Sequence, residues 1–395
     1  MARALDGIRI IDFSKALAGP YGTMLLADQG AEVIKVEMPG SGDDSRGWGP
    51  PFIEGEAAYF LSVNRNKKSI TLNLKDQKAK EIALKLIEKA DIVLESNRPG
   101  VMTKLGLDYE TVKKSNPGII YCSISGFGQT GPYSKRPGFD QVIQGYGGIM
   151  GLTGEKGGGP LKVGIAVTDI ATGMFAVTGI LTALYHREKT GQGQFVDASM
   201  LDGQVSWLTY QAGRYLASGN VPQRMGSAHP LIVPYQDFEA SDGFINIAAG
   251  NDNLWKKMCK VTGLADIADD PKFATNPKRV ENRDEVEKIV SDKIKTKTMA
   301  EWLDILNKAG VPCGPIYTVD QIFKDPQVLA RDMLVELDHP KCGKIQVTGS
   351  PIKLSETPAE ITTHPPMLGE HNSSILQELG FSDEDITQLK KDEVI

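Results

Sequence analysis

Cysteine is scarce in this 395-residue chain, and its four cysteines lie far apart, at Cys122, Cys259, Cys313 and Cys342. No Cys-x-x-Cys pair occurs, which argues against a disulfide framework and against a cysteine-ligated zinc site. Cys122 lies within the apolar run IIYCSIS, where we expect it to pack as a small hydrophobic side chain. Unpaired cysteines are typical of a reducing compartment, so we expect a cytoplasmic protein with no metal site.

An excess of basic residues is also absent. Lysine and arginine number 44 against 50 aspartates and glutamates, and the net charge of -6 argues against non-specific binding to nucleic acid. The N-terminal MARALDGIRI is too short and too mixed for a targeting segment, and the Gly-x-Ser-x-Gly pattern of serine hydrolases does not occur. A chain of this length exceeds the usual size of one core, so we expect two domains.

Strand-like and helix-like runs alternate in the first part of the chain. IRIIDF, AEVIKVE, DIVLES and GIIYCSISGF are predicted strands, while PYGTMLLADQG, DQKAKEIALKLIEKA and YETVKKSN are predicted helices. This alternation predicts an α/β fold with a Rossmann-like, doubly wound parallel sheet. Ligands of such sheets bind at the carboxyl ends of the strands, which are residues 14–19, 37–42, 96–100 and 126–131 here.

The run GFGQTG at 126–131 matches the Gly-x-Gly-x-x-Gly pattern of dinucleotide-binding proteins. That fingerprint requires a helix directly after it, whereas Pro132 and the loop-like YSKRPG follow here. We therefore expect no nicotinamide site, and interpret these glycines as positions where the backbone approaches another ligand closely.

A run rich in glycine and proline, GNVPQRMGSAHPLIVPYQDF, interrupts the alternation near 220–235. The runs after it mix strand-like FINIAAG and PCGPIYT with helix-like NLWKKMCKVTG, RDEVEKIVSDKIK and TMAEWLDILNKAG. The sequence therefore predicts a large domain over 1–220, a smaller α+β domain over 225–325 and a β-rich C-terminal segment over 326–395.

Asp169 is the only charged residue between Val163 and Tyr185, in VGIAVTDIATGMFAVTGILTALY. The run predicts a buried apolar helix rather than a membrane span. Thr168 and Asp169 stand directly before it, where aspartate is a favoured N-cap. A second interpretation is compatible with the first: the positive end of the helix dipole would keep the carboxylate ionised beside apolar walls, as a nucleophile toward an acyl carbon.

Blocks along nearly the whole chain carry a resemblance that favours the chemical interpretation. LDGIRIIDFSKALAGPYGTMLLADQGAEVIKVEMPGSGDDSR is followed in order by NRNKKSITLNL, SNRPGVMTKLGLDYE, ISGFGQTGPYSKRPGFD, VTDIATG, REKTGQGQFVDASMLD, GVPCGPIYTVDQIFKDPQ and LGEHNSSILQELGFS. In this order they resemble the family III, or CaiB/BaiF, CoA-transferases, which include the formyl-CoA:oxalate, carnitine and bile-acid CoA-transferases. The resemblance implies that Asp169 is the nucleophile, that the C-terminal segment returns to the large domain and that two subunits interlock as a homodimer.

The resemblance also implies an acyl-CoA thioester as a substrate, with no permanently bound cofactor. Its phosphates require cationic groups, and the positions after predicted strands favour Arg98, Lys104 and Arg136. Asn97 and Leu72 match contacts on the adenosine side.

Met38 stands where the family often has arginine, so the resemblance leaves the adenine contact there in doubt. Gly250 and Asn251, in AAGNDN, are predicted either to cover the site or to form an ordinary turn. The remaining predicted contacts with CoA or substrate are Ala16, Leu17, Ala18, Phe139 and Met200.

We expect CoA to move from a donor acyl-CoA to an acceptor carboxylate through a mixed anhydride and an aspartyl-CoA thioester on Asp169, without ATP or metal. The alternative enzyme is a 2-methylacyl-CoA racemase, which needs two acid/base groups. Racemases of this superfamily have histidine in a Gly-His-Asp motif where this chain has Phe139, which cannot transfer a proton. A catalytically silent CoA-binding protein on this fold would be expected to lack Asp169.

Leu17 stands where formyl- and oxalate-using relatives have glutamine, and MGSAHPLIVPYQ replaces their glycine run. Both departures argue against oxalate, and the apolar Leu17 favours a larger acyl group. Arg46 or Arg214 could pair with a second carboxylate, so we favour a short dicarboxylate acceptor and a succinyl-CoA-type donor, with carnitine-like and aromatic acids still open. His229 is expected to have a structural or substrate-orienting role.

Overall fold

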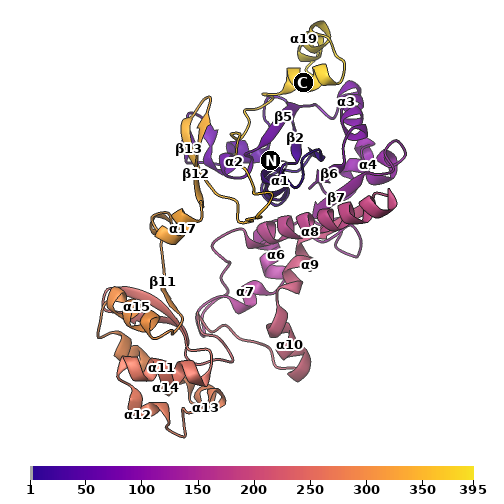
Figure 1. Ribbon diagram of the computed structural model, residues 1–395. Helices are drawn as coiled ribbons and strands as arrows, with labels where there is room; N and C mark the ends of the chain where they lie inside the picture. Colours follow the sequence, from indigo (N-terminus) through magenta and orange to yellow (C-terminus); the bar gives the residue numbers. More distant parts are fainter. Residues whose placement is uncertain (1–2) are drawn as a thin grey trace. The chain divides into compact units, whose positions relative to one another are not determined.

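The computed structural model describes residues 3–395, and these form two compact units (Figure 1). Unit 1 comprises residues 3–149, 162–217 and 326–395, and unit 2 comprises residues 150–161 and 218–325. The segment 150–161, which lies inside the large domain predicted from the sequence, therefore groups with the second unit instead.

Unit 1 is built on a parallel sheet that has six strands within the described residues, in the order β5-β2-β1-β6-β7-β8. The strands are β1 (Arg9–Asp12), β2 (Glu32–Glu37), β5 (Lys67–Thr71), β6 (Ile92–Glu95), β7 (Ile120–Ser125) and β8 (Phe195–Ser199). Ile11 of β1 lies opposite both Ile34 and Val93, so β1 is flanked by β2 and β6. The strand order reverses at β1, which makes its carboxyl end the topological switch point of the sheet.

Helices cover both faces of this sheet, because successive strand side chains point to opposite sides. Ile10 packs with helices α1 (Ala18–Asp28) and α8 (Val167–Thr190), whereas its neighbour Ile11 packs with α3 (Gln77–Glu88) on the other face. This arrangement confirms the predicted α/β, doubly wound architecture.

The other elements of unit 1 are short. They are η1 (Asp44–Gly47), β3 (Phe52–Ile53), β4 (Glu56–Ala57), α2 (Ala58–Val63), α4 (Val101–Leu105), α5 (Tyr109–Val112), α6 (Asp140–Tyr146), α9 (Met200–Ser206), α10 (Thr209–Ser218), α17 (Pro326–Ala330), β12 (Leu334–His339), β13 (Gly343–Thr348), α18 (Asn372–Glu378) and α19 (Asp383–Lys391). The helix α7 (Ile149–Leu152) lies where the chain first passes into unit 2. Strands β12 and β13 pair as an antiparallel hairpin.

The C-terminal segment packs against the edge of the sheet that β5 forms (Figure 1). The side chain of Asn372 accepts a hydrogen bond from the backbone N–H of Thr71 at 2.8 Å, and Val394 accepts one from Asn73 at 2.8 Å. Ile375 of α18 and Leu389 of α19 complete the same hydrophobic core as α3. The first and last parts of the chain therefore share one core.

Unit 2 is an α+β unit with an antiparallel sheet in the order β11-β10-β9. Its core surrounds the fully buried indoles of Trp255 and Trp302. The elements are β9 (Tyr235–Ala240), β10 (Gly243–Ala248), α11 (Asp252–Thr262), α12 (Ala265–Ala268), α13 (Asn276–Glu281), α14 (Arg283–Ile294), α15 (Met299–Lys308), β11 (Cys313–Pro315) and α16 (Val319–Ile322).

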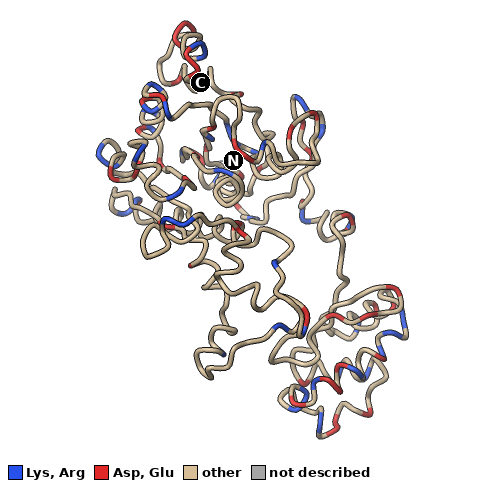
Figure 2. Tube along the Cα trace, turned by 180° about the vertical axis from the view of Figure 1, so that it is seen from behind, with Lys and Arg blue, Asp and Glu red and all other residues tan. Residues whose placement is uncertain are grey.

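Helix α8 is, among residues 3–395, the one helix long and apolar enough to cross a membrane by length and composition. Ala176, Ile180 and Ala183 on one of its faces are buried against the sheet and α1. Its other face leaves Phe175 and Tyr185 exposed. Acidic and basic positions alternate along the chain in both units (Figure 2).

Candidate active site

Most of the predicted site residues follow the carboxyl ends of strands in unit 1. Ala16, Leu17 and Ala18 follow β1, Met38 follows β2, Leu72 follows β5, Asn97, Arg98 and Lys104 follow β6, Arg136 and Phe139 lie after β7, and Met200 follows β8. Gly250 and Asn251 lie in unit 2, where the Asn251 side chain accepts a hydrogen bond from the Leu254 N–H at 2.9 Å and caps α11. This capping contact gives Asn251 a structural task within its own unit.

Asp169 lies within the first turn of α8, not in front of it. The helix begins at Val167, and its N-cap residue, Ala166, makes no side-chain capping hydrogen bond. The interpretation of Asp169 as an N-cap is therefore wrong. The carboxylate instead lies at the positive end of a 24-residue helix and makes no capping hydrogen bond to the N–H groups of that helix.

The cap of α8 comes from another helix. Asp140 Oδ1 accepts hydrogen bonds from the Thr168 N–H at 2.9 Å and from Thr168 Oγ1 at 2.7 Å. Its other oxygen, Oδ2, accepts a hydrogen bond from Gln144 Nε2 at 2.7 Å, and Gln144 Oε1 accepts one from the Val163 N–H at 2.8 Å. These contacts tie α6 to the start of α8 and hold Asp140 beside Asp169.

The surroundings of Asp169 favour the neutral acid. Among residues 3–395, none donates a hydrogen bond to its carboxylate. Burial, followed by the negative charge of Asp140, raises the pKa of Asp169 to about 7. Desolvation and a like charge therefore act against the helix dipole, which we expected to keep this carboxylate ionised.

Tyr59 of α2 belongs to the same group of residues, although the sequence gives no signal for it. Burial, followed by the charges of Asp169, Asp140 and Asp43, raises the pKa of Tyr59 to about 12. Its ring contacts Trp48 edge to face, with the ring centroids 5.1 Å apart. As a neutral phenol, the Tyr59 side chain can donate a hydrogen bond to an anionic group in this part of the site.

Helices α1 and α8 meet at glycines near Asp169. A Cβ on Gly173, one helical turn after Asp169, would lie 2.5 Å from the carbonyl oxygen of Ala18. A Cβ on Gly22 would lie 3.1 Å from the carbonyl oxygen of Gly173. This close approach fixes the start of α1, with Ala18, against the helix that carries Asp169.

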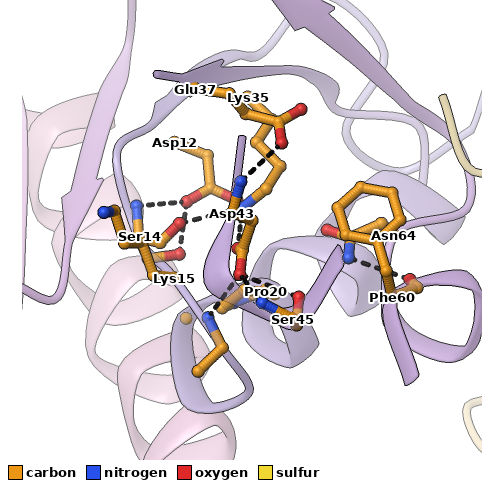
Figure 3. A network of polar contacts seen from close by, with 12 residues as sticks. Asp12, Ser14, Lys15, Pro20, Lys35, Glu37, Asp43, Ser45, Phe60 and Asn64 are labelled. Carbon is orange, nitrogen blue, oxygen red and sulfur yellow. Dashed lines mark hydrogen bonds and ion pairs between the residues drawn. The ribbon is translucent and has the colours of Figure 1, made fainter. Parts of the chain in front are cut away.

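A buried polar network lies behind the loop that follows β1 (Figure 3). Lys35 Nζ lies 2.7 Å from Asp43 Oδ2, and both side chains are fully buried. Burial would raise the pKa of Asp43, but Lys35 and the donors from Ser45 hold it well below its usual range. Burial lowers the pKa of Lys67 to about 7, even though Asp12 beside it acts in the opposite direction.

Asn97 and Arg98 lie where β6 ends. The Asn97 N–H donates to Glu95 Oε2 at 2.6 Å. Arg98 is exposed, and with Glu95 it lines a cavity of about 360 Å³. Burial raises the pKa of Glu95 to about 7, against the hydrogen bonds from Ser123 and Asn97, which lower it.

Lys104 and Arg136 are also exposed. The Arg136 guanidinium lies 3.7 Å from the centre of the Tyr133 ring and donates to the Tyr146 hydroxyl at 3.2 Å. Leu72 and Met200 are buried, so their side chains pack in the protein interior.

The surroundings of Arg46, Phe139 and His229 bear on the roles expected for them. Arg46 donates to both oxygens of Glu37, at 2.7 and 2.8 Å, so the suggestion that it pairs with a substrate carboxylate is not supported. The Phe139 ring is 68% exposed and offers no proton for racemisation. His229 Nδ1 accepts a hydrogen bond from the Leu231 N–H at 3.1 Å within unit 2, which agrees with a structural role.

Unit 1 combines a doubly wound sheet with an acid, Asp169, at the start of a helix beside the topological switch point. The Asp169 carboxylate accepts no hydrogen bond from the described residues. This fold and this site are suited to acyl transfer. The model described as CoA-transferase family III matches residues 5–372, and the chain belongs to this family.

The chain is 44% identical to a succinyl-CoA:glutarate CoA-transferase of Mus musculus over 382 residues, 97% of this chain and 88% of that protein. It is 43% identical to a succinate–glutarate CoA-transferase of Agrobacterium fabrum, over 95% of each chain. It superimposes on the crystal structure of a CaiB/BaiF family protein from Brucella suis with a TM-score of 0.86 at 44% identity, covering 96% of this chain and 100% of the other. The protein is a CoA-transferase.

Proposed function

We propose that this enzyme transfers CoA from succinyl-CoA to a short dicarboxylate such as glutarate, with Asp169 as the nucleophile. The observation that carries the proposal is the Asp169 carboxylate itself, which stands at the positive end of α8 and accepts no hydrogen bond from the part of the chain that the structure describes. The similarity to two relatives named for succinyl-CoA or succinate with glutarate supports this choice of donor and acceptor.

In the first half of the reaction, a carboxylate oxygen of Asp169 attacks the carbonyl carbon of succinyl-CoA. The carbon–sulfur bond breaks, and CoA leaves as its thiolate. The resulting mixed anhydride joins Asp169 to the succinyl group. The thiolate then attacks the aspartyl carbonyl carbon, succinate leaves, and an aspartyl-CoA thioester remains.

The second half reverses these steps with the acceptor. A carboxylate oxygen of glutarate attacks the aspartyl thioester and expels the CoA thiolate, which forms a second anhydride. The thiolate attacks the glutaryl carbonyl carbon, so glutaryl-CoA leaves and the Asp169 carboxylate is regenerated. One thioester is exchanged for another, so the free energy of the bond is conserved through the covalent intermediates.

The raised pKa of Asp169 fits this role in two ways. A carboxylate with a pKa of about 7 is a stronger base, and hence a stronger nucleophile once ionised, than an ordinary aspartate. An electrically neutral anhydride or thioester also suits a half-buried position better than a bare carboxylate does. In the bound complex we assign the phosphates of CoA to the exposed cations Arg98, Lys104 and Arg136.

The test combines transfer and trapping. Wild-type enzyme, Asp169→Asn and Asp202→Asn would be incubated with succinyl-CoA and either glutarate or butyrate, and new thioesters would be identified by mass spectrometry. Asp202 is the matched control, because it is an acidic residue in the first turn of a neighbouring helix. We expect glutaryl-CoA from wild type and from Asp202→Asn, none from Asp169→Asn, and little butyryl-CoA.

Hydroxylamine added with succinyl-CoA should convert residue 169 of the wild type into a hydroxamate. Absence of both transfer and hydroxamate, together with solvent deuterium entering the α-carbon of a 2-methylacyl-CoA, would contradict the proposal and support racemase chemistry.

A further inference from the structure

The loop between β1 and α1 is held by side chains rather than by secondary structure. The consecutive N–H groups of residues 14–16 donate to Asp12 Oδ1 at 2.9 Å, Ser96 Oγ at 3.0 Å and Asp43 Oδ1 at 3.1 Å, respectively. Each acceptor comes from a different part of unit 1: the end of β1, the loop after β6 and the segment before η1. Two of the three acceptors, Ser96 and Asp43, thus come from parts of the sequence far from this stretch of backbone.

Ala16 is the residue of this loop with an unusual conformation. Its φ angle is 65°, in the left-handed region that residues with a Cβ rarely occupy. Such conformations persist only where the surroundings fix them, and they are common at functional sites. The N–H of Ala16 donates a hydrogen bond to the Asp43 carboxylate.

Asp43 is itself held rigidly (Figure 3). Its Oδ1 also accepts hydrogen bonds from the N–H and the hydroxyl of Ser45, at 2.9 and 2.8 Å, while Oδ2 pairs with Lys35 Nζ at 2.7 Å. Lys35 Nζ donates in addition to the carbonyl oxygen of Ser14 at 2.8 Å. The Lys35–Asp43 pair therefore forms hydrogen bonds with the loop at two points, the carbonyl oxygen of residue 14 and the N–H of residue 16.

The loop held in this way continues into α1, which packs against α8, the helix that carries Asp169. Ala18 begins α1, and its carbonyl oxygen faces Gly173, one turn along α8 from Asp169, with no space for a side chain between them. A shift of the backbone at Ala16 would therefore be transmitted to the wall of the site beside Asp169.

We propose that Asp43, with Lys35, is a positioning residue of the transfer reaction. Its carboxylate keeps Ala16 in the left-handed conformation, and this sets the backbone of residues 16–18 against the start of α8. The proposal rests on the proposed role of Asp169 in CoA transfer. Asp43 takes no part in bond making, because its side chain is fully buried in the interior of unit 1.

The experiment compares Asp43→Asn with Asp28→Asn. Asp28 is the matched control, because its carboxylate is equally buried and pairs with Arg65 at 2.7 Å, but it makes no contact with residues 14–17. Both variants lose one buried ion pair, so both should melt at a lower temperature than wild type. We expect kcat for CoA transfer to fall at least about tenfold in Asp43→Asn and to stay within about twofold in Asp28→Asn.

Amide hydrogen exchange gives a readout that does not depend on turnover. In Asp43→Asn, a peptide covering residues 13–17 should exchange at least about tenfold faster than in wild type, whereas Asp28→Asn should leave it unchanged. Adding Ala16→Gly to Asp43→Asn should restore part of the lost kcat, because glycine adopts the left-handed conformation without support. Should Asp43→Asn not fold, Asp43→Glu, which keeps the charge but moves the carboxylate, is measured in its place with the same expectations.

Equal exchange at residues 13–17 in the two variants, or an equal loss of kcat, would overturn the proposal and leave Asp43 with a role in stability alone. If wild type itself transfers no CoA, the proposed function fails, whereas the exchange comparison still decides whether Asp43 holds the loop.

Discussion

Asp140 caps the helix that carries Asp169. Its Oδ1 accepts hydrogen bonds from the N–H and the hydroxyl of Thr168, at 2.9 and 2.7 Å, and Thr168 directly precedes Asp169. The same carboxylate contributes the like charge that raises the pKa of Asp169 to about 7, after the larger effect of burial. One side chain thus fixes the start of the helix and makes its neighbouring acid more basic.

Replacing Asp140 should move the pH profile of the enzyme. Asp140→Asn removes a negative charge that disfavours the Asp169 carboxylate, so the pKa of Asp169 falls and its ionised form persists to lower pH. The rise of kcat/KM with pH, which should have its midpoint near 7 in wild type, should shift toward acid in the variant. The measurement is kcat/KM for succinyl-CoA between pH 5 and 9.

Thr168→Val serves as the control for that shift. It removes the hydroxyl hydrogen bond to Asp140 but keeps the charge, so we expect about 1 kcal/mol less stability and an unchanged midpoint. A midpoint that moves equally in both variants would show that helix geometry, not the charge of Asp140, sets the pKa.

Asp169 should reduce the stability of the folded protein at neutral and alkaline pH. Its folded-state pKa lies above the unfolded value of about 3.9, so the native state holds a proton that the unfolded state has released between about pH 4 and 7. The stabilisation from that proton is present at low pH and is lost as the pH rises through about 7. At pH 8, Asp169→Asn should therefore unfold at a higher denaturant concentration than wild type. Its free energy of unfolding should be greater by on the order of 2 kcal/mol, a figure reduced for the partial exposure of Asp169, and the gain should be smaller at pH 5.

Glu95, which lies outside the immediate neighbourhood of Asp169, should change the stability of the protein with pH in the same direction. Burial raises its pKa to about 7, so Glu95→Gln should also stabilise the protein more at pH 8 than at pH 5. A stability gain in Asp169→Asn that is the same at both pH values would contradict the titration argument.

The contact between α1 and α8 should not tolerate a side chain. Gly173→Ala would place a Cβ 2.5 Å from the carbonyl oxygen of Ala18, so the helices must separate, and we expect a loss of at least about 2 kcal/mol with a marked fall in kcat. Gly213→Ala is the matched control, since Gly213 lies within α10 and a Cβ there meets nothing within 4 Å. That variant should gain about 0.5 to 1 kcal/mol in chemical unfolding. Equal effects would show that the close approach is not required.

The sequence predicts four of the six strands of the main sheet. β1, β2, β6 and β7 lie within the predicted runs, whereas β5 (KKSIT) and β8 (FVDAS) lie outside them. β5 begins with two lysines, and they weaken the hydrophobic pattern of so short a strand. The structure accommodates Lys67 because its ammonium group donates to Asn64 Oδ1 at 2.8 Å and lies 3.4 Å from Asp12 of another strand.

The candidate site shows the same limit. Asp169 stands out in the sequence because every neighbour along the chain is uncharged, which is a local signal. Asp140 and Tyr59 come near Asp169 only because α6 and α2 pack in this part of unit 1. The residues around each of them in the sequence do not indicate that they influence the pKa or the surroundings of Asp169. The assignment of Asp169 as an N-cap is wrong for the same reason. The Thr168 N–H at the start of α8 donates instead to Asp140, which belongs to α6.

The shared core of the first and last parts of the chain has a consequence for synthesis on the ribosome. The sheet strands β1, β2, β5, β6 and β7 emerge early, but the apolar face that α3 covers is completed only by Ile375 and Leu376 of α18 and by Leu389 of α19. Until those residues leave the exit tunnel, that face remains partly open to water and to chaperones. A premature stop codon late in the reading frame would release a chain with all six strands of the main sheet and Asp169, but with an uncovered hydrophobic surface, and such a product should be removed by cellular proteases before it can act.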